Sequence, residues 1–212
     1  MTFKTGLFSK NQYSIFNLII VSVLFVLSGC TSTQPPLSYY LLHSAVPSKQ
    51  SEVTSLQSAS SLDDSTPLLL KSVTLPDYLK HRGLVYQVSD TNLHISTTHL
   101  WAEPFEEGLR KTLQDQLANH GIVMLTTTDY QHNNIVELSL HISDFVSTFN
   151  GNVVLQGHFV VSAELAENNR HPFFIETRLK EDGFSASIVA MRQALAELST
   201  QVTESIKAQN AQ

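Results

Sequence analysis

Apolar positions along the chain repeat with two different periods, which predict two helices and a set of strands. One stripe recurs at every fourth position from Trp101 to Leu117, with Pro104 in the first turn and Gly121 just past the end. A second stripe, at spacings of three and four, runs from Phe184 to Ile206. Both stripes are typical of amphipathic helices that cover a sheet, and we interpret Trp101 and Phe105 as core residues.

Short apolar segments between polar turns predict the strands. An antiparallel or mixed sheet with both helices on one face buries all of these stripes together, so we expect an α/β (α+β) fold. Outside one long hairpin, strands are expected at Ser38–Leu42, Leu68–Leu75, Leu84–Val88, Leu93–Ser96, Ile122–Leu125 and Pro172–Glu181.

The dipeptide Asn150-Gly151 favours the positive backbone angles of a tight hairpin turn. A two-residue loop there sets a register with one apolar face and one polar face. The apolar pairs are Val136 with Leu165, Leu138 with Ala163, Leu140 with Val161, and Ile142 with Phe159. The polar face would pair Ser139 with Ser162, Ser143 with His158, and Glu137 with Glu164. In this register His141 and His158 lie on the polar face, two rungs apart.

The segment 44–67 is rich in serine and contains few aliphatic and no aromatic residues. Such a composition does not repay the entropy of ordering, so a flexible loop is expected there. A loop of this length is unusual inside a compact domain. The alternative is that the segment is a linker and that Tyr39-Tyr40 is a docking motif.

The N-terminus has the layout of a secretory signal. Lys4 and Lys10 precede the apolar run Ile15–Leu27, which is too short for a comfortable bilayer span. The run ends in Leu27-Ser28-Gly29-Cys30, which contains the sole cysteine, so no disulfide forms within the chain. The alternative is an ordinary signal peptide with a chance cysteine.

This motif resembles the lipobox of bacterial lipoprotein precursors. The resemblance implies thioether lipidation of Cys30, cleavage before it and acylation of the new amino terminus. Several acyl chains, at roughly 0.8 kcal/mol per buried methylene, make a stable anchor. Thr31 stands where an aspartate would retain a Gram-negative lipoprotein in the inner membrane, which implies the outer membrane. We therefore divide the chain into a signal peptide (1–29), a lipidated tether (30–37) and one domain (38–212).

Charge and motif searches exclude several functions. Without residues 1–29 the chain has 11 basic and 19 acidic residues, so a nucleic-acid partner is not expected. The nine histidines show no spacing of a closed metal site. The chain has no Gly-x-Ser-x-Gly elbow, glycine-rich phosphate loop or His-Glu-x-x-His helix. We expect no enzyme, no metal and no cofactor other than the covalent lipid.

Two aromatic regions are candidate partner contacts. Tyr78 and Leu79 follow Leu75-Pro76-Asp77 in an expected loop, where an exposed pair suits a partner or subunit contact. Tyr39 and Tyr40 form the other candidate. The alternative for Tyr78 is that it covers the end of the sheet.

Four segments carry a family resemblance. Cys30 is followed by Ser38–Leu42, Val73–Val85 and Trp101–Pro104, and in this order they resemble the ABC-type transport auxiliary lipoprotein family. The resemblance implies an accessory outer-membrane lipoprotein of an envelope-spanning lipid transport system. Its implied partner is a periplasmic MCE-domain protein, which it would dock near the membrane. A homo-oligomeric ring is compatible with that role.

Two other functions stay open. One is a lipid carrier that holds an acyl chain between helices and sheet, which requires an apolar cavity of several hundred cubic ångströms. The sequence shows no sign of such a cavity. The other is a scaffold for cell-wall or secretion machinery, because fold alone does not choose among these roles.

Overall fold

The computed structural model describes residues 35–43, 65–125, 135–162 and 169–210. The chain divides into the units Met1–Pro36 and Leu37–Gln212. The expected signal peptide, the lipidation site Cys30 and most of the segment 44–67 lie outside the described residues. The expected loop ends earlier than proposed, because Thr66 and Pro67 already belong to a strand.

The described part of the domain contains eight strands, two α-helices and one short 3₁₀ helix. A mixed sheet with two helices confirms the expected fold class. The elements are β1 (Ser38–Tyr40), β2 (Thr66–Thr74), η2 (Asp77–Lys80), β3 (Gly83–Ser89), β4 (Asn92–Trp101), α2 (Phe105–Ala118), β5 (Ile122–Leu125), β6 (Val136–Ser147), β7 (Asn152–Ser162), β8 (Asn169–Arg178) and α3 (Phe184–Asn210).

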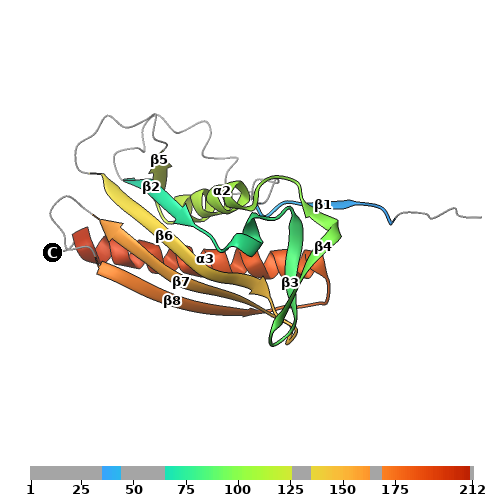
Figure 1. Cartoon of the computed structure of the whole chain (residues 1–212). Helices are drawn as coiled ribbons and strands as arrows, with labels where there is room; N and C mark the ends of the chain where they lie inside the picture. Colours follow the sequence, from blue (N-terminus) through green and yellow to red (C-terminus); the bar gives the residue numbers. More distant parts are fainter. Residues whose placement is uncertain (1–34, 44–64, 126–134, 163–168, 211–212) are drawn as a thin grey trace, which may run out of the picture. The chain divides into compact units, whose positions relative to one another are not determined.

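Strand β6 is the centre of the sheet (Figure 1). Its first half pairs in parallel with β2, which continues to β5. Near its end, Ser147 pairs with Tyr86 of β3, and β3 leads to β4 and β1. Its other edge carries β7 and then β8 in antiparallel order. A single long strand therefore joins the two groups of neighbours into one sheet.

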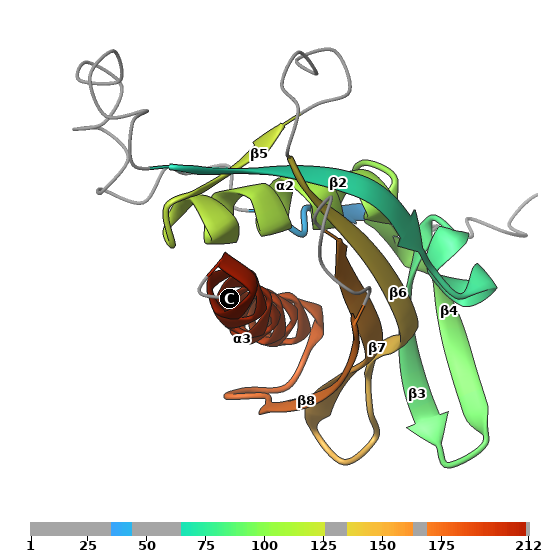
Figure 2. The same ribbon diagram turned by 90° about the vertical axis from the view of Figure 1, so that its left-hand side faces the viewer.

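Both helices lie on the concave face of this sheet (Figure 2). Helix α3 packs along β7 and β8, and α2 packs beside α3 and β5. The expected stripes are the buried faces, since Leu109, Leu113 and Leu117 of α2 are at most 1% exposed. From α3, the apolar stripe that includes Leu195, Leu198 and Val202 is buried in the same core cluster. No helix among the described residues has the length and apolarity needed to cross a bilayer.

Several predicted element ends are corrected. Trp101 ends strand β4 and is not on α2, which begins at Phe105 directly after Pro104. Strand β4 continues past the predicted end at Ser96, and β8 covers Asn169–Arg178 and not Pro172–Glu181. The core role of Trp101 and Phe105 is confirmed, because each is 4% exposed and their rings lie 5.3 Å apart.

The predicted hairpin exists, but its register is wrong. Leu138 pairs with Val161 and Leu140 with Phe159, a shift of two residues from the expected pairs. The turn is longer than two residues, since the N–H of Thr148 donates to the carbonyl of Asn152. A bulge between Ile142 and Asp144 adds the second residue of the shift. Because a shift of two restores the alternation, the predicted apolar face is still the buried one.

The polar face of the hairpin changes with the register. His141 and His158 are direct partners and not two rungs apart, and their rings lie 4.7 Å from each other. Glu137 pairs with Ser162, which replaces the expected contact between two glutamates. Its carboxylate instead accepts a 2.7 Å hydrogen bond from Lys71 on β2.

Candidate functional site

The N-terminal strand is fixed to the last helix by Arg192. Its guanidinium donates to the carbonyl oxygens of Leu42 (2.6 Å), Leu41 (3.1 Å) and His43 (3.0 Å). Partial burial lowers the pKa of Arg192, although the group keeps its charge at neutral pH. Three carbonyls at the entry of the chain are thereby held by one side chain of α3.

Glu103 supports the same entry from the turn between β4 and α2. Its carboxylate contacts Lys111, and its Oε1 lies 2.8 Å from Nδ1 of His43. Burial acts to raise the pKa of Glu103, but the hydrogen bond and charge of Lys111 and the charge of His43 outweigh it. The pKa of Glu103 therefore lies below its ordinary value. The ionised carboxylate can thus hold both neighbours at neutral pH.

The two tyrosines of β1 have different environments. Tyr39 is 54% exposed, and the guanidinium carbon of Arg82 lies 5.8 Å from its ring centroid. Tyr40 is half-buried and its hydroxyl lies 2.9 Å from Nδ1 of His99 on β4. Of this candidate pair, Tyr39 is therefore the residue that presents a large surface.

The expected exposed pair Tyr78-Leu79 is not formed. Leu79 is 3% exposed and belongs to the core cluster, because η2 turns its side chain inward. The Tyr78 hydroxyl donates to Asp144 (3.3 Å) and accepts from the N–H of Phe145 (3.0 Å). Tyr78 thus ties η2 to the bulged part of β6, which agrees with the alternative that it covers the end of the sheet.

The environment of Tyr78 also changes its titration. Burial raises the pKa of Tyr78 to about 12, and the nearby charge of Asp144 acts in the same direction. The hydrogen bond from the Phe145 N–H acts against this rise. The hydroxyl therefore stays protonated well above neutral pH.

An aromatic cluster surrounds Phe184, the first residue of α3. Its ring stacks on His99 at 4.1 Å, and the rings of Tyr86 and Tyr40 lie 5.6 and 6.1 Å away. His94 extends the cluster along the hairpin of β3 and β4, 5.1 Å from Tyr86. The cluster joins the start of α3 to three strands.

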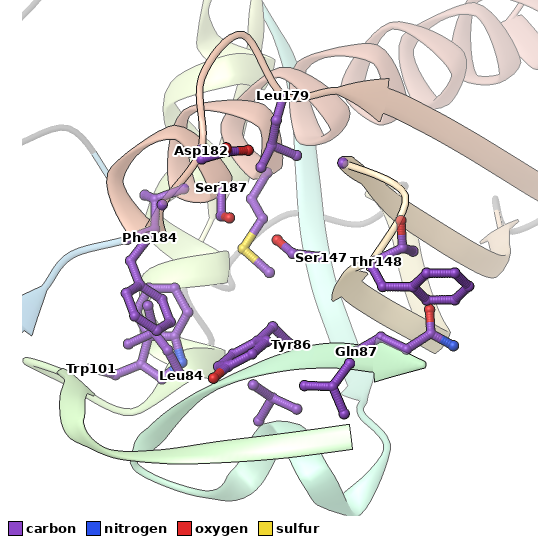
Figure 3. A pocket seen from close by; sticks show the side chains of 17 residues that line it. Leu84, Tyr86, Gln87, Trp101, Ser147, Thr148, Leu179, Asp182, Phe184 and Ser187 are labelled. Atoms are coloured by element: carbon purple, nitrogen blue, oxygen red, sulfur yellow. The ribbon is translucent and has the colours of Figure 1, made fainter. Parts of the chain in front are cut away.

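An open pocket of about 470 Å³ lies beside this cluster (Figure 3). In Figure 3, Trp101, Leu84 and Phe184 form one side of it, and Tyr86 lies along strand β3 below. Deep lining residues are closed to solvent, with Trp101, Leu84, Ile188 and Met191 each 4% exposed. Sequence patterns gave no sign of this pocket, because its walls come from β3, the β6–β7 turn and the start of α3.

Polar groups in the pocket are few. Ser147 of β6 and Ser187 of α3 line it, and Thr148 is bonded to the carbonyl of Asn152. Among the lining residues, Asp182 alone carries a full charge at neutral pH, and it is exposed. The pocket therefore combines an apolar interior with a sparsely polar border, as small-molecule pockets do.

The paired histidines form a second polar feature on the convex face. Arg170 of β8 lies 3.0 Å from Nδ1 of His158. Burial lowers the pKa of His158, and the charges of Arg170 and His141 add to that effect. Within the described ranges, no group of three histidine, cysteine or acidic side chains could hold a metal ion.

Comparison with known proteins decides the family. The model of the ABC-type transport auxiliary lipoprotein component matches residues 40–203. The chain belongs to this family. That assignment confirms the resemblance described above, and a transport auxiliary lipoprotein is not an enzyme class.

Two curated relatives agree with the transport auxiliary lipoprotein assignment, and solved structures share the fold. The chain is 26% identical over 190 residues to "Intermembrane transport lipoprotein PqiC" of Escherichia coli (strain K12) and of Shigella flexneri. The match covers 90% of this chain and 96% of each relative. A crystal structure of an uncharacterized protein superposes with a TM-score of 0.64 at 25% identity, covering 81% of this chain and 99% of the other. A Xanthomonas campestris protein shares the fold, with a TM-score of 0.52, 14% identity and coverage of 68% and 88%.

The described features lie within the part of the chain that the family model matches. Arg192, Tyr78 and the pocket all lie between residues 40 and 203. Two features were missed by sequence reasoning, namely Arg192 and the pocket. Neither has a local pattern, because each is made by segments far apart in the chain.

Proposed function

We propose that this transport auxiliary lipoprotein is a non-catalytic subunit of an intermembrane lipid transport system, anchored in the outer membrane through acylated Cys30. The observation that carries the proposal is the family match over residues 40–203, which begins ten residues after the sole cysteine in a segment that resembles a lipobox. The full-length match to the intermembrane transport lipoprotein PqiC supports the same system.

The subunit's role is to dock a periplasm-bridging MCE-domain protein close to the membrane. The short interval between Cys30 and β1 supports this role, because the eight residue steps from Cys30 to Ser38 span at most about 29 Å when fully extended. Arg192 fixes residues 41–43, directly after β1, to helix α3. A docked partner would therefore be held near the bilayer, and not at the end of a long flexible linker.

Tyr39 is the contact that we assign to the partner first. It is exposed on the edge strand β1 and lies beside Arg82, an aromatic and arginine combination enriched in binding hot spots. Tyr40, Tyr78 and Leu79 act behind it by holding β1 and η2 in place. A ring of several copies of this chain is compatible with such an edge contact.

The test is in-cell crosslinking of the lipidated protein, followed by purification and mass spectrometry of the attached proteins. We expect an MCE-domain protein, and we expect Tyr39→Ala to reduce its recovery about tenfold, as loss of a hot-spot residue does. Phe174→Ala is the matched control, because Phe174 is an exposed aromatic residue on the distant edge strand β8. Recovery of cell-wall or secretion proteins in place of an MCE-domain protein would contradict the role and favour the scaffold alternative.

The membrane assignment has its own test. Thr31→Asp should move the protein from the outer-membrane to the inner-membrane fraction, if position 31 controls sorting as the resemblance implies. Thr33→Asp, two residues further on, is the control and should not change the fraction. An unaltered distribution of Thr31→Asp would contradict the sorting assignment and leave the family assignment intact.

A further inference from the structure

The open pocket beside Phe184 has the dimensions of a ligand site. Its volume of about 470 Å³ lies in the range of roughly 300–1,000 Å³ that small-molecule pockets occupy. Protein interiors normally close such spaces, since unfilled apolar volume forfeits packing energy. A retained opening of this size with a buried apolar floor can take an apolar occupant.

The pocket runs from a buried floor to an exposed apolar rim. The floor is formed by Trp101, Ile188 and Met191, each 4% exposed. The rim consists of Val88 on β3 and Phe149 in the β6–β7 turn, which are 48% and 51% exposed. The end of β3 and the β6–β7 turn lie at the same end of the domain (Figures 1 and 2). An apolar group that enters from outside would therefore stay in apolar contact along its whole path.

Charge selects against one class of apolar ligand. Asp182 is the charged residue of the lining, and it is exposed at the start of α3. A free fatty acid carries a carboxylate at the end of its chain, which has the same sign of charge as Asp182 of the lining. When an acyl chain is esterified in a lipid, its carboxyl group is a neutral ester and carries no charge. The pocket is thus better suited to the chain of a larger lipid than to a free acid.

The attachment of the chain places bilayer lipids within reach. Ser38, the first residue of β1, pairs with His99, and the ring of His99 stacks on Phe184 in the pocket wall. Strand β1 thus begins beside a residue that contacts the pocket wall. Eight residues connect Cys30 to Ser38, which limits their separation to about 29 Å.

We propose that this pocket binds one acyl chain of a bilayer phospholipid. Binding positions the domain against the membrane surface, with the glycerol and headgroup left outside the rim. This inference rests on the lipid anchor in the proposed function, because the anchor supplies the high local concentration of phospholipid. It adds a lipid contact to a subunit whose proposed role is to dock a protein.

The test uses the full lipidated chain in vesicles of phosphatidylethanolamine and phosphatidylglycerol. A small share of the phosphatidylethanolamine carries a diazirine in one acyl chain, and illumination is followed by peptide mapping. We expect cross-links in residues 84–88 of β3 and in Phe184, Ser187, Ile188 and Met191 of α3, which line the pocket. Flotation of the same sample reports separately whether the anchor holds the chain on the vesicle.

A filling variant and its neighbour make the test specific. Ser187→Trp places an indole in the pocket and should lower these cross-links about tenfold. Ser185→Trp is the matched control, since Ser185 is exposed on the same turn of α3 but does not line this pocket. At the rim, Phe149→Ser should lower the yield, and Phe174→Ser on the edge strand β8 should not.

The outcomes separate the pocket from the proposed function. If the protein floats with the vesicles but carries no cross-links in the pocket lining, the inference is overturned. The occupant is then a partner side chain or the protein's own acyl group. Equal cross-linking in Ser187→Trp and Ser185→Trp also overturns it. Failure to float contradicts the anchor, whereas cross-links in the lining support the pocket even then.

Discussion

Arg192 donates a hydrogen bond of 2.6 Å to the carbonyl oxygen of Leu42, although 150 positions separate the two residues. Leu42 is itself buried, and its Cβ lies beside Gly108 of α2, where an added Cβ would approach it to 3.1 Å. The turn after β1 is therefore enclosed by both helices. This enclosure explains how a three-residue edge strand, Ser38–Tyr40, can be part of the folded domain.

Arg192→Ala should lower the free energy of unfolding by about 2 to 4 kcal/mol. The variant leaves the carbonyls of Leu41, Leu42 and His43 without their donor, and hydrogen bonds to charged groups are worth about 1.5 to 3 kcal/mol each and are not additive. Urea unfolding of the purified chain measures the change. The control is Arg110→Ala, whose ion pairs of 3.8 and 3.9 Å lie on the surface of α2, with an expected change below about 0.5 kcal/mol. Equal midpoints for the two variants would contradict the role of Arg192.

Tyr78→Phe should cost about 1 to 3 kcal/mol, because the N–H of Phe145 loses its acceptor in a half-buried site. Tyr39→Phe removes a hydroxyl from an exposed ring and should change stability by less than about 0.5 kcal/mol. Both can be compared by urea unfolding at neutral pH. If Tyr78→Phe keeps full stability but loses the MCE partner, Tyr78 is a docking residue and our structural assignment is wrong.

The same hydroxyl predicts a loss of stability at alkaline pH. Between pH 10 and about 12 the unfolded chain releases the Tyr78 proton and the folded chain keeps it, so the folded state binds more protons and stability falls as pH rises. Tyr78→Phe has no such hydroxyl. The stability advantage of the wild type over Tyr78→Phe should therefore become smaller as the pH rises through this interval. Unfolding series at pH 9, 10 and 11 test the sign, and a constant difference across them would refute the raised pKa.

Gly157→Ala should be more damaging than an ordinary glycine replacement. A Cβ at Gly157 would lie 2.1 Å from the carbonyl oxygen of His141 and 3.0 Å from the Phe173 ring, so the two strands must separate. We expect a loss of about 3 kcal/mol or more. Gly151→Ala is the comparison, because its positive φ of 78° is strained but its Cβ meets nothing within 4 Å, which should cost about 1 to 2 kcal/mol. The reverse order of the two midpoints would show that the close approach at Gly157 is tolerated.

Periodicity predicted the faces of the hairpin, but it did not predict the pairing. Leu138, Leu140, Phe159 and Val161 are buried as expected, because alternation depends only on each strand. Register depends on the turn and on the bulge after Ile142, which are made by both strands together. A glycine inside a strand is a sign of such a bulge, and Gly157 pairs with Ile142 at this point.

The candidate contacts were harder to predict than the fold. A tyrosine and a leucine after a proline favour an exposed loop, yet η2 buries Leu79 and gives Tyr78 two polar partners from β6. Asp144 and Phe145 lie more than 60 residues later, so no local pattern reports them. Arg192 lies next to the apolar stripe of α3 and was not singled out, because its three acceptors are main-chain carbonyls that any sequence would supply.

The attachment of β1 has a mechanical consequence. In the proposed anchored state, tension on the chain reaches the domain at Ser38, and β1 lies parallel to β4 through three register pairs. Pulling along the strand loads this ladder and the Arg192 hydrogen bonds together, so that the load is shared before any one of them breaks. The force that the subunit withstands is then governed by the rate at which this junction opens, and not by the stability of the whole domain.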